Sequence, residues 1–222
     1  MYIKTLQSNA QRMMSENGFL GIQDHSFDTI GRSQFITLLD HGLTPYDKVV
    51  DIGCGCLRAG FWLINFLHRG NYYGLEPSEL RVKCGIDYIM SPNSMIYKTP
   101  IFHYNEDFNL QIFNTKFDFF LAYSIFTHAS KDQTKIILDE FVACSNPDSV
   151  FITSYFPATN PEEDYQGKEW VGTSHKSQTI GIIRHSFEWL RNECHSRNLE
   201  IVDIGEIVLQ RVLKITHRNI PR

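Results

Sequence analysis

The sequence predicts an α/β fold with a mostly parallel β-sheet that helices cover on both faces. Apolar segments with the length of buried strands alternate along the chain with amphipathic segments at helical spacing, a pattern typical of parallel sheets. The last two strand-like segments, at about 199–204 and 208–216, are separated only by the short turn Gly205-Glu206. Strands joined so closely pair antiparallel. We therefore expect seven strands, with one antiparallel hairpin at the C-terminal edge of the sheet.

The chain has the size of one compact domain with room for an insertion. It has 222 residues, of which 42% are hydrophobic, enough for a complete core. We expect a helical extension or lid at 1–45 and a main domain at 46–222. Residues 156–184 have little periodicity, and a loop this long in a compact domain is usually functional or disordered. They are the expected insertion near the functional site.

Two helices are expected before the first strand. The first, at about 4–17, carries apolar residues on one side, namely Leu6, Ala10, Met13 and Met14. The second, at about 29–41, stops at Gly42 with Pro45 beyond, as helix ends commonly do. Residues 18–28 are expected to form the loop between them.

The segment DIGCGCLRAG at 51–60 predicts a nucleotide-cofactor site. It follows the apolar run Val49-Val50 and reads as a buried strand that ends in Asp51, a glycine turn, and a helix at about 57–67. A dinucleotide turn for hydride transfer has glycines at its first, third and sixth positions. Gly53 and Gly55 fill the first two, but Arg58 occupies the third. A long cationic side chain there would obstruct the close packing of helix on strand, which argues against a dehydrogenase.

The remaining elements follow from apolar runs, caps and helix breakers. Strands are expected at 72–75, 101–104, 117–122 and 149–155, and helices at about 79–90, 130–145 and 186–197. Pro92 is expected to end the helix at 79–90. Ser130 and Gln133 have the spacing of a capping box at the start of the next helix, and Asn146-Pro147-Asp148 is expected to form a turn.

Composition excludes several functional classes. The net charge is −4 and no tract of Lys or Arg could follow a phosphate backbone, so nucleic acid is not an expected partner. No segment approaches the roughly 18 apolar residues of a membrane span, and the N-terminal segment does not resemble a secretion signal, so we expect a cytoplasmic protein. Cys54 and Cys56 are the only close cysteine pair and lack a second pair at zinc-site spacing, so no metal is expected.

The segment at 51–60 resembles motif I of class I S-adenosylmethionine-dependent methyltransferases. The acid at the strand end and the glycine displaced to position 60 carry this resemblance, which extends over about 46–216. It implies a Rossmann-like three-layer sandwich whose seven-stranded sheet ends in a hairpin. It also implies S-adenosylmethionine as the cofactor.

The family's pattern assigns a cofactor role to residues around the glycine turn. Gly53 and Gly55 lie against the methionine portion of the cofactor, with Cys54 between them. Glu76, which follows the second strand at about 20 residues past the glycines, binds the ribose hydroxyls; the alternative is a solvated acid at a strand end. Asp51 either contacts the cofactor or braces the turn by accepting backbone N–H bonds.

The resemblance assigns two further groups of residues. Asp107 and Phe108 match the acid and aromatic pair that holds adenine, although they could equally be an exposed acid and a core aromatic. Directly after the strand at 117–122, the family places residues under the cofactor and beside the acceptor. Ala122 is accordingly assigned to the cofactor, and Tyr123 and Ser124 to the acceptor. The residues here match neither the proline-containing motif for amino groups of bases nor the acidic metal cluster of catechol-type members.

His128 is the candidate general base, because a neutral imidazole can accept a hydroxyl proton near pH 7. The alternative is a histidine bonded to backbone near a helix start. His175, in the insertion with Trp170, is a second candidate for binding the acceptor. Arg32 and Gln34, before the first strand, could reach the cofactor carboxylate or the acceptor, or could belong to a solvated helix face.

We therefore expect a metal-independent enzyme that transfers a methyl group to a hydroxyl of a small polar acceptor. Two short segments, Cys-Leu-Arg-Ala-Gly in motif I and Phe-Thr-His after the strand at 117–122, resemble the corresponding segments of methyltransferases of bacterial glycoconjugate assembly. This weaker resemblance implies a sugar or a nucleotide-linked sugar in capsule or lipopolysaccharide biosynthesis. The alternatives are N- or carboxyl-methylation of another metabolite and a non-catalytic binding or scaffold domain. The oligomeric state is left open.

Overall fold

The chain forms two compact units, Met1–Glu106 and Asp107–Arg222, in a computed structural model that describes residues 2–21, 26–173 and 181–218. The elements of the N-terminal unit are α1 (Tyr2–Asn17), α2 (Phe27–Asp40), β1 (Val49–Ile52), α3 (Gly60–Phe66), β2 (Tyr72–Leu75), α4 (Glu79–Cys84), the π-helical turn η2 (Gly85–Ile89), α5 (Pro92–Lys98) and β3 (Ile101–His103). Those of the C-terminal unit are the 3₁₀ turn η3 (Gln111–Phe113), β4 (Phe117–Ala122), α6 (Lys131–Cys144), β5 (Ser145–Tyr155), α7 (Phe187–Ser196), β6 (Leu199–Ile207) and β7 (Gln210–His217).

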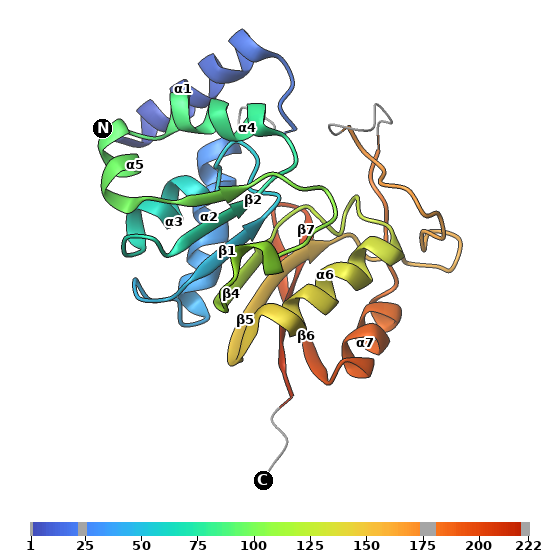
Figure 1. Ribbon diagram of the computed structural model, residues 1–222. Helices are drawn as coiled ribbons and strands as arrows, with labels where there is room; N and C mark the ends of the chain where they lie inside the picture. The colour runs from blue at the N-terminus through green and yellow to red at the C-terminus, as the bar shows by residue number, and fades with distance from the viewer. Residues whose placement is uncertain (1, 22–25, 174–180, 219–222) are drawn as a thin grey trace. The chain divides into compact units, whose positions relative to one another are not determined.

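The strands form a seven-stranded mixed sheet in the order β3-β2-β1-β4-β5-β7-β6 (Figure 1). β1 pairs in parallel with β2, β2 with β3, and β4 with β5. β7 runs antiparallel to both of its neighbours, β5 and β6. The predicted α/β fold with a C-terminal hairpin is confirmed. Within that hairpin β7 is the inner strand, and β6 forms the edge.

The core of the N-terminal unit includes both helices that precede β1. Leu6, Ala10 and Met13 of α1 are buried in one cluster with Phe27 of α2 and with Cys56 of the glycine turn. α1 also packs against η2, and Figure 1 shows it beside the α4 segment. The helices therefore form part of this compact unit.

Aromatic side chains fill the core of the C-terminal unit. Phe120 of β4 contacts Phe141 of α6 edge to face, with ring centroids 4.8 Å apart. The ring centroids of Phe141 and Phe151 of β5 are 5.4 Å apart. Such aromatic pairs add to the stability that burial of their apolar area provides. α6 begins with the predicted capping box, in which Ser130 and Gln133 bond each other's backbone N–H groups. That local prediction is confirmed.

Three boundaries in the N-terminal unit differ from the sequence prediction. The helix expected from position 57 begins only at Gly60, because Leu57 has a left-handed φ of +62° and its N–H closes a turn by donating to the Cys54 carbonyl at 3.0 Å. Pro92 starts α5 as well as ending the preceding segment. A proline fits the first helical position, where its missing N–H is not needed, and the Ser91 hydroxyl accepts the Ser94 N–H at 3.0 Å. The loop predicted at 18–28 is also shorter, since α2 begins at Phe27.

Two turns in the C-terminal unit were also placed wrongly. The hairpin turns at Val208 and Leu209, with φ of +48° and +66°, instead of at Gly205-Glu206. Gly205, with φ of +119°, lies inside β6 at a shift of register next to Asp203, where a bulge explains the glycine. The segment at 146–148 is an irregularity within β5, which begins at Ser145.

None of the helices in the described ranges is both long enough and apolar enough to cross a membrane.

Candidate active site

The turn after β1 leaves space against its backbone. Gly53 and Gly55 have left-handed φ values of +73° and +51°, which glycine adopts without the steric cost of a side chain. The N–H groups of Gly53 and Cys54 donate to the Leu75 carbonyl of β2 at 2.7 and 3.1 Å and fix the turn to the next strand. A β-carbon on Gly55 would meet no protein atom closer than the Gly53 carbonyl oxygen at 3.9 Å. A ligand group can therefore approach the backbone at Gly55.

Glu76 is buried directly below this turn. Its side chain is 4% exposed, and its carboxylate accepts the Gly55 N–H at 3.2 Å and the Ser78 N–H at 3.1 Å. The Arg81 guanidinium lies 3.6 Å away. Glu76 is therefore not a solvated acid at a strand end, which was the alternative prediction. The sequence reasoning missed Arg81, although its place in the first turns of the helix after Glu76 is a usable signal.

Asp51 is buried at the end of β1 and accepts a hydrogen bond from the Tyr72 hydroxyl of β2 at 2.8 Å. Burial raises the pKa of Asp51 to about 7, although the Tyr72 hydrogen bond and the charge of Arg58 act in the opposite direction. Burial also raises the pKa of the Cys54 thiol well above its usual value. Both side chains therefore lie in a low-dielectric environment beneath the glycine turn.

In the C-terminal unit, the last residue of β4 and the residue after it are held by other strands. Ala122 is fully buried, and its carbonyl accepts the Thr153 hydroxyl at 2.9 Å. The Tyr123 hydroxyl donates to the Ile207 carbonyl of β6 at 2.7 Å. These bonds fix the backbone at the end of β4.

Ser124 is held by residues that sequence reasoning did not identify. Its φ of +61° is uncommon for a residue other than glycine, and its N–H donates to the Ser154 hydroxyl at 2.7 Å. The Gln210 amide donates to the Ser124 hydroxyl at 2.8 Å, and the Ser154 hydroxyl donates to the Gln210 carbonyl oxygen at 2.6 Å. Gln210 is separated from Ser124 by 86 positions, so no local signal could have revealed it.

His128 is fixed by the insertion that follows β5. Its Nδ1 lies 2.7 Å from the Val171 carbonyl, its ring stacks on Trp170 at 5.4 Å, and the Val171 N–H donates to the His128 carbonyl at 3.0 Å. With the proton on Nδ1, the neutral ring carries its lone pair on Nε2. Burial lowers the pKa of His128, against the opposing effect of the Val171 and Gly181 carbonyls. The ring is therefore neutral at pH 7.

Asp107 and Phe108 differ in burial. Asp107 is exposed and accepts the N–H of Asn109 at 3.2 Å, which forms a local turn. Phe108 is 9% exposed and has a left-handed φ of +61°. A bulky residue in this backbone conformation is unusual and marks a tightly constrained loop.

The remaining candidates lie on α2 or outside the described residues. Arg32, on α2, has a side chain that is 41% exposed and pairs with Asp28 at 3.3 Å. Gln34 is buried in α2. His175 lies outside the described residues. In the ranges 2–21, 26–173 and 181–218, no three His, Cys, Asp or Glu side chains are grouped so that they could hold a metal ion.

Solved structures share this fold over nearly the whole chain, whereas no protein-family model matches the sequence. Magnesium protoporphyrin IX methyltransferase from Synechocystis PCC 6803, solved with bound S-adenosylmethionine, has 15% identity and a TM-score of 0.65, over 98% of this chain and 93% of that one. An S-adenosylmethionine-dependent methyltransferase from Clostridium acetobutylicum has 11% identity and a TM-score of 0.62, over 95% and 98%. The glycopeptide N-methyltransferase MtfA has 9% identity and a TM-score of 0.62, over 85% and 94%. The chain therefore has the fold of the class I S-adenosylmethionine-dependent methyltransferases.

Proposed function

We propose that the protein is an S-adenosylmethionine-dependent methyltransferase that methylates a hydroxyl group of a small polar acceptor. The observation that carries this proposal is the glycine turn, where Gly55 is open to a ligand and donates its N–H to the buried Glu76 carboxylate. The similar proteins whose structures contain this cofactor support it further.

The residues at the turn fit the proposed cofactor. The left-handed glycines allow the methionine portion to pass close to the backbone. Glu76 accepts two backbone N–H bonds, and a carboxylate has about four lone-pair positions in total. The remaining capacity suits ribose hydroxyl donors. When bound, S-adenosylmethionine supplies a methyl group on a positively charged sulfur.

His128 is the proposed general base. An acceptor hydroxyl must lose a proton as its oxygen is methylated, and Nε2 of the neutral ring takes that proton. The hydrogen bond from Nδ1 to the Val171 carbonyl holds the tautomer, and this carbonyl then stabilises the imidazolium that forms. Trp170 stacking limits rotation of the ring. The role of the rest of the chain is to position the acceptor.

The acceptor is proposed to be a sugar or a nucleotide-linked sugar of glycoconjugate biosynthesis. Two observations support this acceptor class. The sequence segments in motif I and after β4 resemble those of glycoconjugate methyltransferases, and the C-terminal unit contains polar groups, including Ser124 and Gln210. The Asp203–Arg211 ion pair, at 2.7 Å, adds charged groups at the β6–β7 hairpin.

All five cysteines are free and buried, which supports a reducing, cytoplasmic location. The insertion at 156–184 and the helices at 1–45 are the proposed acceptor-side elements.

Calorimetric titration with S-adenosylmethionine tests the cofactor site through a matched pair of glycine variants. Gly55 and Gly70 both have left-handed φ values, and neither has protein atoms close to the position of a β-carbon. Alanine therefore imposes a similar backbone cost at both sites, about 1 kcal/mol. We expect Gly55→Ala to weaken cofactor binding at least about tenfold, or 1.4 kcal/mol, because its methyl group enters the ligand space. Gly70→Ala should bind normally.

Equal affinities of these two variants would place the cofactor elsewhere. Binding of NAD without binding of S-adenosylmethionine would instead favour a dehydrogenase. A screen of sugar, nucleotide-sugar, amine and carboxylate acceptors, read by release of S-adenosylhomocysteine, then identifies the acceptor class. Cofactor binding with no turnover on any acceptor would favour the scaffold alternative.

A further inference from the structure

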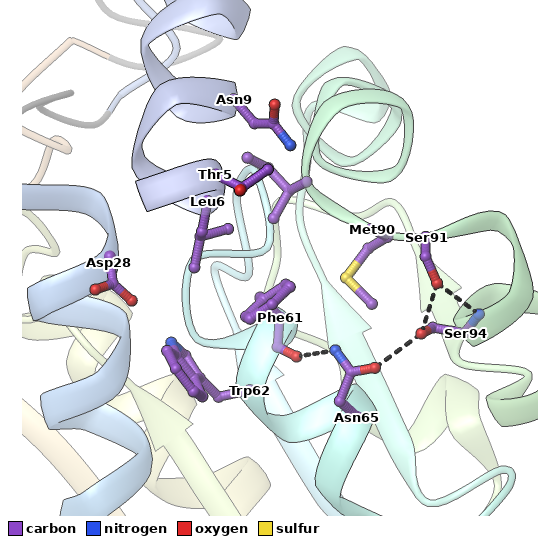
Figure 2. A pocket seen from close by; sticks show the side chains of 11 residues that line it. Thr5, Leu6, Asn9, Asp28, Phe61, Trp62, Asn65, Met90, Ser91 and Ser94 are labelled. Carbon is purple, nitrogen blue, oxygen red and sulfur yellow. Dashed lines mark hydrogen bonds between the residues drawn. The ribbon is translucent and has the colours of Figure 1, made fainter. Parts of the chain in front are cut away.

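The N-terminal unit contains a cavity of about 530 Å³. Side chains from α1, α2, α3 and the segment from η2 to α5 line it (Figure 2). Neither Glu76 nor any residue of the turn at 51–57 is among its lining residues. Its volume is within the range of about 300–1,000 Å³ that small-molecule sites have.

Among the described residues that line the cavity, Asp28 is the one that is ionisable. It is 4% exposed. Its Oδ2 lies 3.3 Å from the Arg32 guanidinium, whose side chain is 41% exposed, while its Oδ1 is buried without a hydrogen-bond partner among the described residues. An unpartnered buried carboxylate oxygen is costly. The Asp28 carboxylate is therefore paired with Arg32 through one oxygen and lacks a partner for the other.

The walls around this carboxylate are aromatic and aliphatic. Phe61 and Trp62 of α3 have ring centroids 5.3 Å apart at 89° to one another, and Leu6 and Met90 line the cavity beside them. Figure 2 shows Asp28 at the end of the cavity where Trp62 lies. Aromatic rings attract an organic cation through their electron-rich faces, and apolar walls take its hydrocarbon part.

Three of the other polar residues of the cavity, Asn65, Ser91 and Ser94, form hydrogen bonds with one another or with Phe61, whereas the Trp62 indole N–H is buried without a partner among the described residues. The Asn65 amide donates to the Phe61 carbonyl at 2.7 Å, and the Ser94 hydroxyl donates to the Asn65 carbonyl oxygen at 2.8 Å. The Ser94 N–H is capped by the Ser91 hydroxyl. Recognition of a charged group therefore depends on Asp28.

We propose that this cavity is a second ligand site, which binds an organic amine with an apolar body. The protonated nitrogen donates to the Asp28 carboxylate, and the hydrocarbon packs against Phe61, Trp62 and Met90. Organic anions are disfavoured, because Asp28 would repel them and the described lining residues include no cation. This site is independent of the proposed methyl-transfer function.

Calorimetric titration of the full chain with three probes of similar shape tests the proposal. The probes are 2-phenylethylamine, 2-phenylethanol and 3-phenylpropanoate. We expect the amine to bind at least about tenfold more tightly than the alcohol, and the carboxylate not to bind. The amine should also shift the Trp62 indole N–H resonance, assigned with a Trp62→Phe variant. Equal affinity for amine and alcohol, or no saturable binding of the amine up to about 10 mM, would overturn the proposal.

Two aspartates of the same helix provide a matched pair of variants. Asp28→Asn should weaken binding of 2-phenylethylamine at least about tenfold, whereas Asp40→Asn, at an exposed position of α2, should leave it unchanged. Unchanged affinity in a folded Asp28→Asn variant would refute the site. If the Asp28→Asn variant does not fold, Trp62→Leu provides the test. It should weaken binding of 2-phenylethylamine at least about fivefold through the lost ring contact, and an unaltered affinity would refute the site. S-adenosylmethionine affinity, measured in parallel, tests the cofactor proposal separately.

Discussion

Asp51 illustrates, at the scale of a single residue, how burial changes the chemistry of a side chain. Its folded-state pKa of about 7 exceeds the ordinary value of 3.8, so the folded protein favours the protonated form. Stability from this group is fully present below about pH 4 and falls as the pH rises toward 7. Asparagine cannot ionise, yet it retains an oxygen that can accept the Tyr72 hydroxyl.

We therefore expect the stability of Asp51→Asn relative to the natural protein to increase between pH 5 and pH 8. The expected increase is on the order of 1–3 kcal/mol, measured by denaturant unfolding without cofactor at both pH values. The exposed Asp40→Asn variant should show no such difference. A stability difference for Asp51→Asn that does not change with pH would mean that Asp51 ionises normally in the folded state.

His128 carries the residue-scale prediction about turnover. Burial lowers its pKa below the ordinary 6.5, so the base form is present at neutral pH and is lost only in more acidic solution. We expect kcat to fall on the acid side with an apparent pKa below 6.5. His128→Ala should lower kcat by about 10²–10⁴-fold and abolish this limb, with cofactor affinity retained.

The exposed His68 provides the control for this prediction. His68→Ala should leave kcat and its pH profile unchanged. Normal turnover of His128→Ala would remove His128 as the base, and the Nδ1 bond to Val171 would then be a purely structural contact.

At the scale of elements, Asp164 ties the described part of the insertion to two helices. Its Oδ2 is 2.6 Å from Lys131 at the start of α6, and its Oδ1 accepts the Ser186 N–H before α7 at 2.9 Å. Both side chains of the ion pair are largely buried, at 17% and 14% exposure. Partial burial acts to raise the pKa of Asp164, but these bonds and the Lys131 charge together leave it lowered.

Asp164→Ala should therefore destabilise the protein by about 1–3 kcal/mol, because Lys131 and the Ser186 N–H lose their partner. Limited proteolysis between positions 156 and 184 should become faster. Asp132→Ala, which removes an exposed partner 3.6 Å from Lys135, should change stability by less than about 0.5 kcal/mol. Similar values for the two variants would show that the insertion is held by other contacts.

The elements that the sequence predicted well are those with local signals. The capping box of α6 and the apolar run of β4 lie within a few residues of the structure they specify. The wrong boundaries arise where a local signal has two meanings. Gly205 and Pro92 are residues typical of turns and helix ends, yet one forms a bulge in β6 and the other begins α5.

For the whole molecule, cofactor binding is expected to raise thermal stability. A ligand that binds only the folded state at 100 times its Kd adds about 2.7 kcal/mol. For a chain of 222 residues this corresponds to an increase in Tm of roughly 5–10 °C. A thermal melt followed by circular dichroism with S-adenosylmethionine, and with NAD as the control, measures this shift. A shift with NAD alone would contradict the proposed cofactor.

The sequence by itself determined the α/β fold class, the glycine turn and the residue types that could bind a cofactor. These depend on periodicity, spacing and local caps, which short segments of the chain contain. Only the tertiary structure decided how those residues are held: Asp51 by Tyr72 across 21 positions, His128 by Val171 across 43, and Ser124 by Gln210 across 86. The physical reason is that such contacts depend on strand order, on register and on the path of the insertion, and these are fixed only when the whole core packs.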